Sequence, residues 1–346
     1  MKKRLFSMLG MLLLIFVTAC SGASNPGSGD SAAQAAGNDG SAKKVIIAEP
    51  NHQLGYLPVY VALNEGFFQE EGLDVELLMT GGGQHVNAVL TGNAHAFVGG
   101  PEWNAFALER DGGKEKVIKA VSGVTHRGNV YLVGKPNTTL PTDPEQLKQL
   151  FKGKTIVVGV NGSTTNSIPR YYLKSIGLDP DKDVTLVAVE TGNIISTFKS
   201  MNADFAAGVE PNLSEGIDQG IYGQPLVNFP KQWGEYAYST LNVSEKLINS
   251  DPEMVQKLVN GVAKGLDLIQ SDPDKAREIA KKEFSTMDPR ALELSVNRFL
   301  EDQLWEGAKW ISKDAFEISM KIVVEAGKLK EVPAYESLVE TKFMKK

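Results

Sequence analysis

The feature that most constrains the fold is a regular alternation of short β-branched runs with segments of helical periodicity. The β-branched runs have the length of buried strands and lie at 45–48, 75–79, 96–98, 117–121, 130–133, 156–160 and 184–189. The helix-compatible segments between them lie at 59–65, 84–90, 103–110, 144–151, 165–175 and 194–201. This alternation predicts an α/β fold built on mostly parallel sheets.

The last third of the chain has a different, helical pattern. Asp251, Asp272 and Asp288 are each followed by proline, and an N-cap carboxylate before proline at the first helical position is typical of a helix start. We therefore predict that three helices begin there. A further helix is expected over 312–326, with Gly327 as its C-cap.

The N-terminus resembles a bacterial lipoprotein leader. Three basic residues precede an uncharged apolar run at 5–17, which is too short for a comfortable membrane span. The run ends at Val17-Thr18-Ala19-Cys20, which is similar to a lipobox, and Cys20 is the only cysteine. We expect a signal peptide over 1–19, lipidation of Cys20 and a flexible tether over 20–42, rich in Ser, Gly and Ala. A plain secretory signal is the alternative.

Composition excludes several functional classes. The chain has 346 residues, which suggests about two domains, and a single cysteine forbids an internal disulfide. Its 36 Lys and Arg face 42 Asp and Glu, and removal of 1–19 takes away three cations, leaving 33 against 42, or −9. Because nucleic-acid binding rests on clustered basic surface, we expect no nucleic-acid partner. No later segment has the length of an apolar membrane span.

The common catalytic signatures are missing. The four histidines form no pair with the spacing of a zinc site, and neither a phosphate-binding loop nor a nucleophile elbow is found. The glycines at 81–83 lack the dinucleotide-binding spacing. These patterns favour binding over catalysis, and we expect no enzyme activity, no cofactor and no metal.

Four turns rich in glycine and hydroxyl residues stand between expected strand ends and helix starts, at 54–58, 80–84, 99–103 and 161–165. In α/β folds such turns bind ligands, because the amides at helix N-termini point outward without intrahelical partners. Each turn alone is also compatible with an ordinary βα connection.

Here the sequence resembles a known family. The stretch GYLPVYVALNEGFFQEEGLDVE at 55–76 is similar to the start of one branch of ABC-importer substrate-binding proteins, which serve aliphatic sulfonates, taurine, nitrate, thiamine pyrimidine precursors and riboflavin. The likeness continues at 90–96, 147–160, 201–211, 243–246 and 251–253. It therefore covers nearly the whole mature chain.

The resemblance implies a type II periplasmic-binding-protein fold, with two α/β lobes of mixed sheets, two hinge strands and a ligand cleft between the lobes. Lobe 1 would comprise 43–134 and the return segment 238–346, and lobe 2 would comprise 135–237. The hinge strands are expected near 130–133 and 236–242, and the C-terminal helices are expected to pack mainly on lobe 1. Ligand would select the closed state of the cleft.

The resemblance also implies which residues line the cleft. On lobe 1 they are Tyr56, Gly83, Gln84, Glu102 and Trp103, and on lobe 2 they are Ser163, Thr164, Thr165, Asn193 and Glu210, with Trp233 near the mouth. The rings of Tyr56 and Trp103 could stack on ligand or pack beneath it, and Trp233 could pack between the lobes. Glu210 could instead pair with Arg127 or Arg170.

Two ligand classes remain open. The helix start at 162–165, with Gln84 and Arg127, suits an oxyanion such as a sulfonate or nitrate. Glu102 and Glu210 would repel an anion, so we favour a nitrogen-bearing aromatic such as a thiamine pyrimidine precursor or a flavin.

The expected partners are this small molecule, an ABC permease with its ATPase, and the membrane through Cys20. The protein is expected to be a monomer, lipid-anchored outside the cytoplasm on a Gram-positive surface or in a periplasm. The alternatives are a ligand-sensing lipoprotein and an enzyme resembling the yeast thiamine-pyrimidine synthase, whose cysteine-rich motif is absent here.

Overall fold

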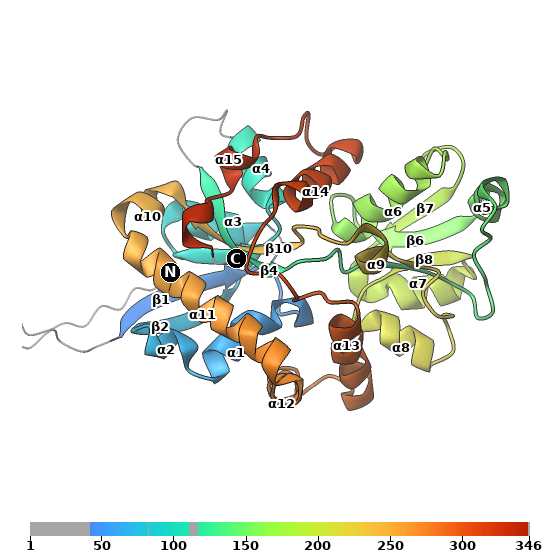
Figure 1. The fold of residues 1–346 in the computed structure, drawn as a ribbon. Coiled ribbons are helices and arrows are strands. Elements are labelled where there is room, and N and C mark those ends of the chain that lie inside the picture. The colour runs from blue at the N-terminus through green and yellow to red at the C-terminus, as the bar shows by residue number, and fades with distance from the viewer. Residues whose placement is uncertain (1–41, 82, 111–116, 345–346) are drawn as a thin grey trace, which may run out of the picture. The chain divides into compact units, whose positions relative to one another are not determined.

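The computed structural model describes residues 42–81, 83–110 and 117–344 and contains two separate five-stranded sheets (Figure 1). Both sheets mix parallel and antiparallel pairs and carry helices, as the strand–helix alternation predicts. The α/β fold class is therefore confirmed. The expected signal peptide, Cys20 and nearly all of the expected tether lie outside the described residues.

The first sheet has the strand order β2-β1-β3-β10-β4. Its strands are β1 (Lys43–Glu49), β2 (Leu73–Met79), β3 (Ala96–Gly99), β4 (Ile118–Thr125) and β10 (Ser239–Ser244). β1 runs parallel to β2 and β3, whereas β10 is antiparallel to β3 and β4. A strand from late in the chain is therefore inserted between two early ones.

The second sheet has the order β7-β6-β8-β5-β9. Its strands are β5 (Tyr131–Gly134), β6 (Thr155–Gly159), β7 (Thr185–Val189), β8 (Phe205–Gly208) and β9 (Val227–Asn228). β6 runs parallel to β7 and β8, and β5 is antiparallel to β8 and β9. The carboxyl ends of β6, β7 and β8 therefore share one edge.

The chain passes between the sheets in two short segments, 126–130 and 234–238. These segments run side by side, since the Tyr236 N–H donates to the His126 carbonyl at 2.8 Å and the Tyr238 N–H to the Thr125 carbonyl at 3.2 Å. Both crossings lie a few residues ahead of the ranges 130–133 and 236–242 expected for the hinge strands. Tyr131–Gly134 is fully buried and pairs along its whole length with Phe205–Gly208, so it lies wholly in the second sheet. The second sheet therefore begins before residue 134, where the first lobe was expected to end.

Fifteen α-helices are found among the described residues. They are α1 (Leu57–Asn64), α2 (Phe67–Glu70), α3 (Gln84–Thr91), α4 (Glu102–Arg110), α5 (Pro144–Phe151), α6 (Thr164–Ser175), α7 (Ile194–Met201), α8 (Asn212–Asp218), α9 (Phe229–Trp233), α10 (Glu245–Ser250), α11 (Pro252–Ser271), α12 (Pro273–Glu283), α13 (Pro289–Glu301), α14 (Lys313–Glu325) and α15 (Tyr335–Leu338). Three single 3₁₀ turns lie at Leu54–Tyr56, Thr191–Asn193 and Thr341–Phe343.

The three helix starts predicted at Asp-Pro pairs are confirmed. The Asp251, Asp272 and Asp288 side chains each accept a hydrogen bond from the backbone N–H three residues on, at 3.0, 3.0 and 2.8 Å. Each therefore satisfies one of the amides that a helix N-terminus leaves without an intrahelical partner.

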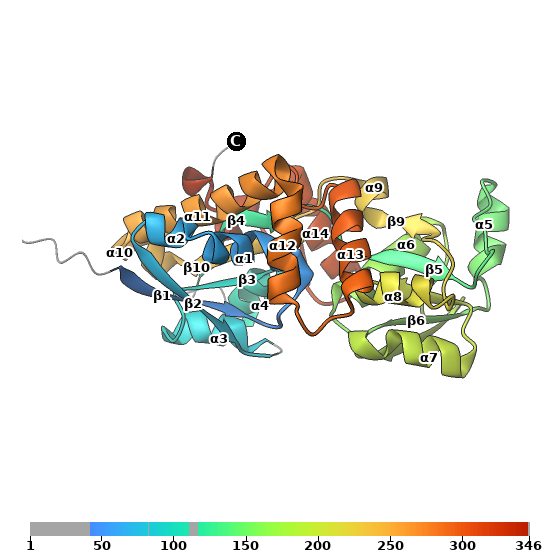
Figure 2. The same ribbon diagram turned by 90° about the horizontal axis from the view of Figure 1, so that it is seen from below.

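The C-terminal helices pack mainly on the first sheet, as expected, and two of them also contact the second. α11 and α12 cover α1, with Gly265 of α11 against the Pro58 carbonyl. In addition, α13 contacts α8 (Figure 2) and α14 contacts α6, and both α6 and α8 belong to the second sheet. The larger apolar side chains of these two helices, such as Phe299 of α13 and Phe316 of α14, lie in clusters of the first sheet, whereas Ile322 of α14 joins the core of the second.

Candidate functional site

A cleft of about 500 Å³ lies between the two sheets. Its walls are mostly the loops that follow β1 and β3 in the first sheet and β6, β7 and β8 in the second. The lining residues are Pro50, Asn51, Gln53, Tyr56, Gly99, Gly100, Glu102, Trp103, Asn129, Val160, Gly162, Ser163, Thr164, Thr165, Glu190, Thr191, Gly192, Val209, Glu210, Tyr238 and Ser239. In open α/β sheets ligands bind outside the carboxyl ends of parallel strands, and this cleft has that position in both sheets.

Seven of the residues named from the sequence line this cleft: Tyr56, Glu102, Trp103, Ser163, Thr164, Thr165 and Glu210. Tyr56 is only 3% exposed, and its ring belongs to the core of the first sheet. The Trp103 ring makes edge contacts with His85 and Phe106, at centroid distances of 4.9 and 5.7 Å. Both rings are therefore held by packing while forming part of the cleft wall.

The other four named residues do not line the cleft. Gly83 packs beneath the Trp103 ring, and Gln84 is exposed and accepts a hydrogen bond from Asn87. Asn193 is exposed at the start of α7, whereas its neighbours Thr191 and Gly192 do line the cleft. Trp233 is half-buried and packs against the core of the second sheet, with ring centroids 4.6 Å from Phe229 and 5.5 Å from Tyr171.

Glu102 is a carboxyl group of the cleft whose pKa is strongly shifted by its surroundings. It begins α4, and its carboxylate folds back over Gly100, where a Cβ would collide with it. Burial raises the pKa of Glu102 to about 7, although a hydrogen bond from its own backbone N–H opposes the shift. A carboxyl group with this pKa can change its charge state on ligand binding.

The charge of Glu102 contributes to the pKa of three buried tyrosine hydroxyls. Burial first, with a smaller contribution from the Glu102 charge, raises the pKa of Tyr56, Tyr236 and Tyr238, the last to about 12. These hydroxyls therefore stay neutral near pH 7.

Glu210 is 6% exposed, and hydrogen bonds within the protein use both of its oxygens. Oε1 accepts from Ser214 Oγ at 2.8 Å and from Arg298 Nε at 2.6 Å, whereas Oε2 accepts from the Ser214 N–H and Ser295 Oγ, both at 3.0 Å. Burial raises the pKa of Glu210, and the bonds from Ser214 and Arg298 oppose this. The carboxylate therefore joins the second sheet to α13 and has little capacity left for a ligand.

The Arg127 and Arg170 partners considered for Glu210 lie elsewhere. The Arg127 guanidinium donates to the Pro230 carbonyl at 3.1 Å and to Gln303 Oε1 at 3.2 Å. Arg170 pairs with Asp181 at 2.8 Å. Arg298, which lies 88 residues beyond Glu210 in the chain, takes this role instead.

The start of α6 contributes three hydroxyls to the cleft. Thr164 Oγ1 lies 3.2 Å from the Tyr238 hydroxyl, and this hydrogen bond joins the second sheet to the first. Ser163 Oγ donates to the Val160 carbonyl and lies 2.8 Å from Thr165 Oγ1. The hydroxyls are therefore fixed in position beside the cleft.

The charge of the cleft wall is one-sided. Among the described residues that line it, Glu102, Glu190 and Glu210 are acidic, and none is Lys, Arg or His. A cation lies just outside the lining, since Lys328 Cε would be 3.9 Å from a Cβ on Gly162. The wall is thus better suited to a neutral or cationic ligand than to an anion.

Several lining residues were not named from the sequence. Asn51, Gln53 and Glu190 directly follow the runs at 45–48 and 184–189, so the rule that ligands lie beyond strand ends could have found them. Asn129 lies in the segment between the sheets, where no local pattern marks it.

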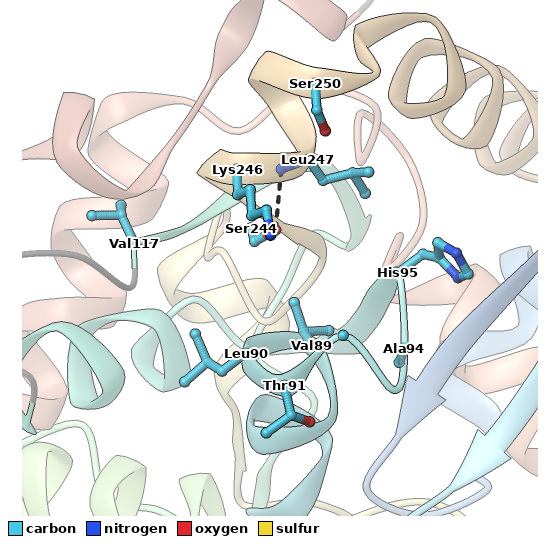
Figure 3. A pocket seen from close by; sticks show the side chains of 11 residues that line it. Val89, Leu90, Thr91, Ala94, His95, Val117, Ser244, Lys246, Leu247 and Ser250 are labelled. Carbon is cyan, nitrogen blue, oxygen red and sulfur yellow. Dashed lines mark hydrogen bonds between the residues drawn. The ribbon is translucent and has the colours of Figure 1, made fainter.

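A second, smaller pocket of about 330 Å³ lies against the first sheet alone (Figure 3). Its walls include Leu90, Ala94 and His95 on one side and Lys246 and Leu247 on the other. Ala94 and His95 precede β3, so this pocket lies at the amino end of the strand whose carboxyl end opens into the cleft. Open α/β sheets bind ligands beyond the carboxyl ends of their strands, so the second pocket is not at the position expected for a ligand.

Two general features of the described residues bear on function. Within 42–344, outside the gaps at 82 and 111–116, no helix combines the length and apolar character needed to span a bilayer. Over the same residues, no cluster of three or more His, Cys, Asp or Glu side chains could hold a metal ion.

Comparison with known proteins places the chain in a defined group. A family model described as NMT1/THI5 like matches residues 53–276. The putative binding protein YtlA of Bacillus subtilis (strain 168) is 27% identical over 306 residues, covering 88% of this chain and 89% of that protein.

Two solved structures share the fold. The periplasmic aliphatic sulphonate binding protein SsuA of Escherichia coli has a TM-score of 0.69 at 12% identity, covering 86% of this chain and 92% of that one. The desulfurization enzyme DszB has a TM-score of 0.63 at 16% identity, covering 87% of this chain and 97% of that one. At these identities the likeness establishes the architecture alone.

Proposed function

Because this chain belongs to the NMT1/THI5-like family, we propose that it is the binding protein of an ABC importer and captures a nitrogen-bearing aromatic solute. The observation that carries the ligand class is the cleft wall, which holds Glu102, Glu190 and Glu210 without a Lys, Arg or His. A sulfonate or nitrate would have to enter beside these carboxylates, whereas ligand N–H groups can donate to Glu102 and Glu190, since the Glu210 oxygens are already bonded within the protein.

The aromatic part of the ligand has a matching surface. Trp103 and Tyr56 form part of the wall on the same side as Glu102. Neighbouring side chains already fix both rings, so a ligand that stacks on them would cost little side-chain conformational entropy. A thiamine pyrimidine precursor or a flavin combines the ring and the nitrogen groups that this wall accepts.

Uptake of an aliphatic sulfonate, taurine or nitrate is the second candidate. It is favoured by the start of α6, where Ser163, Thr164 and Thr165 line the cleft at a helix N-terminus, and by Lys328 beside Gly162. The likeness to a sulphonate-binding protein points the same way. The three carboxylates of the wall oppose it.

The proposed setting is outside the cytoplasm. The protein would be attached to the membrane by lipidated Cys20 and would deliver ligand to a permease and its ATPase as a monomer. A sensor that passes its ligand-bound state to another membrane protein would use the same cleft. An enzyme is the less favoured alternative: the fold also supports desulfurization in DszB, but the only cysteine of this chain is Cys20, ahead of the described residues.

The test is thermal unfolding of the full chain carrying Cys20→Ala, with hydroxymethylpyrimidine (the aminopyrimidine half of thiamine), riboflavin, taurine, an alkanesulfonate and nitrate. A ligand at about 100 times its Kd stabilises the native state by about 2.7 kcal/mol, which shifts Tm by several degrees. We expect the shift with a heterocycle. A shift with sulfonate, taurine or nitrate alone would reject the favoured ligand class.

The role of the wall is checked by the variant Trp103→Ala. It should weaken heterocycle binding, with Trp233→Ala as a control because Trp233 packs away from the cleft. Equal affinities in the wild type and Trp103→Ala would remove Trp103 from the site.

A further inference from the structure

The segment 50–53 is the part of the cleft wall that follows β1. Three of its four residues line the cleft, whereas His52 does not. The His52 ring stacks instead on Tyr60 of α1, with ring centroids 4.3 Å apart. This side chain therefore attaches the segment to the interior of the protein.

The imidazole ring of His52 lies between two carboxylates. Its Nδ1 is 3.1 Å from Glu49 Oε1, and its Nε2 is 3.7 Å from Glu283 Oε2. Glu49 ends β1 and is 4% exposed, whereas Glu283 ends α12, which packs on α1. The ring of Phe284, the next residue, lies 4.7 Å from the His52 ring. One side chain therefore links the cleft wall both to the first sheet and to a helix from the last third of the chain.

Each carboxylate has one oxygen bonded elsewhere, which leaves the other for the ring. Glu49 Oε2 accepts from the Tyr60 hydroxyl at 2.7 Å, and Glu283 Oε1 accepts from Asn64 Nδ2 at 2.6 Å. The Nζ of Lys282 is a nearby cation, but it donates to Asn64 Oδ1 at 2.6 Å. The titratable groups around the ring are therefore Glu49 from β1, Tyr60 from α1, and Lys282 and Glu283 from α12.

Protonation decides how many of these carboxylates the ring can bind. The imidazolium form carries an N–H on both nitrogens, whereas the neutral form carries one. If Nδ1 keeps its proton for Glu49, the lone pair of Nε2 faces the Glu283 carboxylate and the attraction between them is lost. The hydrogen bond to Glu49 raises the pKa of His52 above its ordinary value of 6.5, the charges of both carboxylates add to this, and burial opposes it. The protonated form therefore persists to a higher pH than in a free histidine.

We propose that His52 is a positioning residue of the cleft: when protonated it holds the segment 50–53 against α12, and when neutral it releases the segment from α12. The inference goes beyond the proposed function by adding control by pH, and it rests on that function only in taking the cleft as the site of binding. A wall segment that is already fixed costs less conformational entropy to order when a ligand binds. Capture of solute is therefore favoured on the acid side of the His52 pKa, and release on the alkaline side.

The experiment needs no ligand and uses the full chain carrying Cys20→Ala. The tested variants are His52→Phe, whose ring can still stack on Tyr60 but has no N–H, and Glu283→Gln, which removes the charge facing Nε2. The control is Glu278→Gln, which removes one negative charge at an exposed position of the same helix. NMR titration of the histidine rings gives the pKa of His52, whose signal is the one missing from His52→Phe.

Hydrogen exchange of the backbone amides at 51–53, corrected for the intrinsic exchange rate at each pH, reports how firmly the segment is held. In the wild type and in Glu278→Gln, protection should fall at least about threefold from about pH 5 to about pH 9. Protection should change little with pH in His52→Phe and in Glu283→Gln. The second of these variants should also lower the pKa of His52.

Thermal unfolding gives a second readout with a defined sign. A histidine whose pKa is raised by folding stabilises the native state below its unfolded pKa, and this contribution is lost as the pH rises through the folded pKa. The Tm of the wild type relative to His52→Phe should therefore be higher at about pH 5 than at about pH 9.

Three results would overturn the inference. They are a His52 pKa at or below 6.5, protection in the wild type that does not change with pH, and an equal change in the wild type and His52→Phe, which would assign the effect to another group such as Glu102. If His52→Phe does not fold, the comparison of Glu283→Gln with Glu278→Gln decides. Because no ligand is present, these results leave the proposed function untouched, and the ligand series above tests that function separately.

Discussion

The charge state of Glu102 leads to a pH-dependent stability that one substitution should remove. Burial raises the pKa of this carboxyl to about 7 in the folded protein, against an ordinary value of 4.5. Between these two values the folded protein binds a proton that the unfolded chain has released. The native state is therefore destabilised progressively as the pH rises from 4.5 to 7, and the loss is complete above 7.

The size of the effect follows from the shift. A difference of about 2.5 pKa units corresponds to about 3 kcal/mol at 1.36 kcal/mol per unit. This value is an upper bound, because the Glu102 side chain is partly exposed to the cleft and solvent screens its charge. We expect the free energy of unfolding to change by about 1–2 kcal/mol. At about 2–4 °C per kcal/mol this is a few degrees in Tm.

The assay is thermal unfolding of wild type and Glu102→Gln without ligand, at about pH 5 and about pH 8. Glutamine keeps the shape of the side chain and cannot ionise, so the variant should gain stability over wild type at the higher pH and much less at the lower. Glu76→Gln, at an exposed position on β2, is the control for loss of one negative charge. An equal difference between wild type and Glu102→Gln at both pH values would refute the reasoning.

Two further predictions concern packing. Arg298→Met leaves the Glu210 carboxylate buried without its cation and should lower the free energy of unfolding, measured in urea, by about 3 kcal/mol. Adding Glu210→Gln to this variant should recover part of the loss. An unchanged urea midpoint in Arg298→Met would contradict the assigned pairing. Gly265→Ala places a Cβ against the Pro58 carbonyl where α11 crosses α1, so it should destabilise the folded protein by about 1–3 kcal/mol. Gly72→Ala is the comparison variant, because its Cβ would meet no atom and it tests backbone strain alone. A wild-type Tm in Gly265→Ala would show that the two helices can move apart without cost.

Much of the cleft could be predicted because its position depends on topology. Residues that follow parallel strands share one edge of a sheet, and the turns at 99–103 and 161–165 do border the cleft, with Glu102 and Trp103 on the side of the first sheet and Ser163 on the side of the second. The same rule failed at 80–84, although this turn also follows a strand. β2 is an edge strand of the first sheet, so the turn after it lies to the side and Gln84 faces solvent.

Residues far apart in the chain explain what could not be predicted. Glu210 was expected to meet ligand or a nearby arginine, but Ser295 and Arg298 reach it from a helix that is remote in sequence. Trp233 directly precedes the second crossing in the chain, yet its ring packs against Phe229 and Tyr171 at the core of the second sheet. The Glu210 outcome has no local cause, whereas Trp233 combines a contact with Phe229, four residues earlier on α9, with one to the distant Tyr171.

The sequence by itself determined the class of fold and the places where helices begin, because strand alternation and N-caps act over a few residues. Asp251, Asp272 and Asp288 each bond to an amide three residues on, whatever the rest of the chain does. Only the tertiary structure decided that Glu210 is saturated and that His52 lies between Glu49 and Glu283. Hydrogen-bond satisfaction of a buried group depends on every segment that packs around it, and no local pattern records those neighbours.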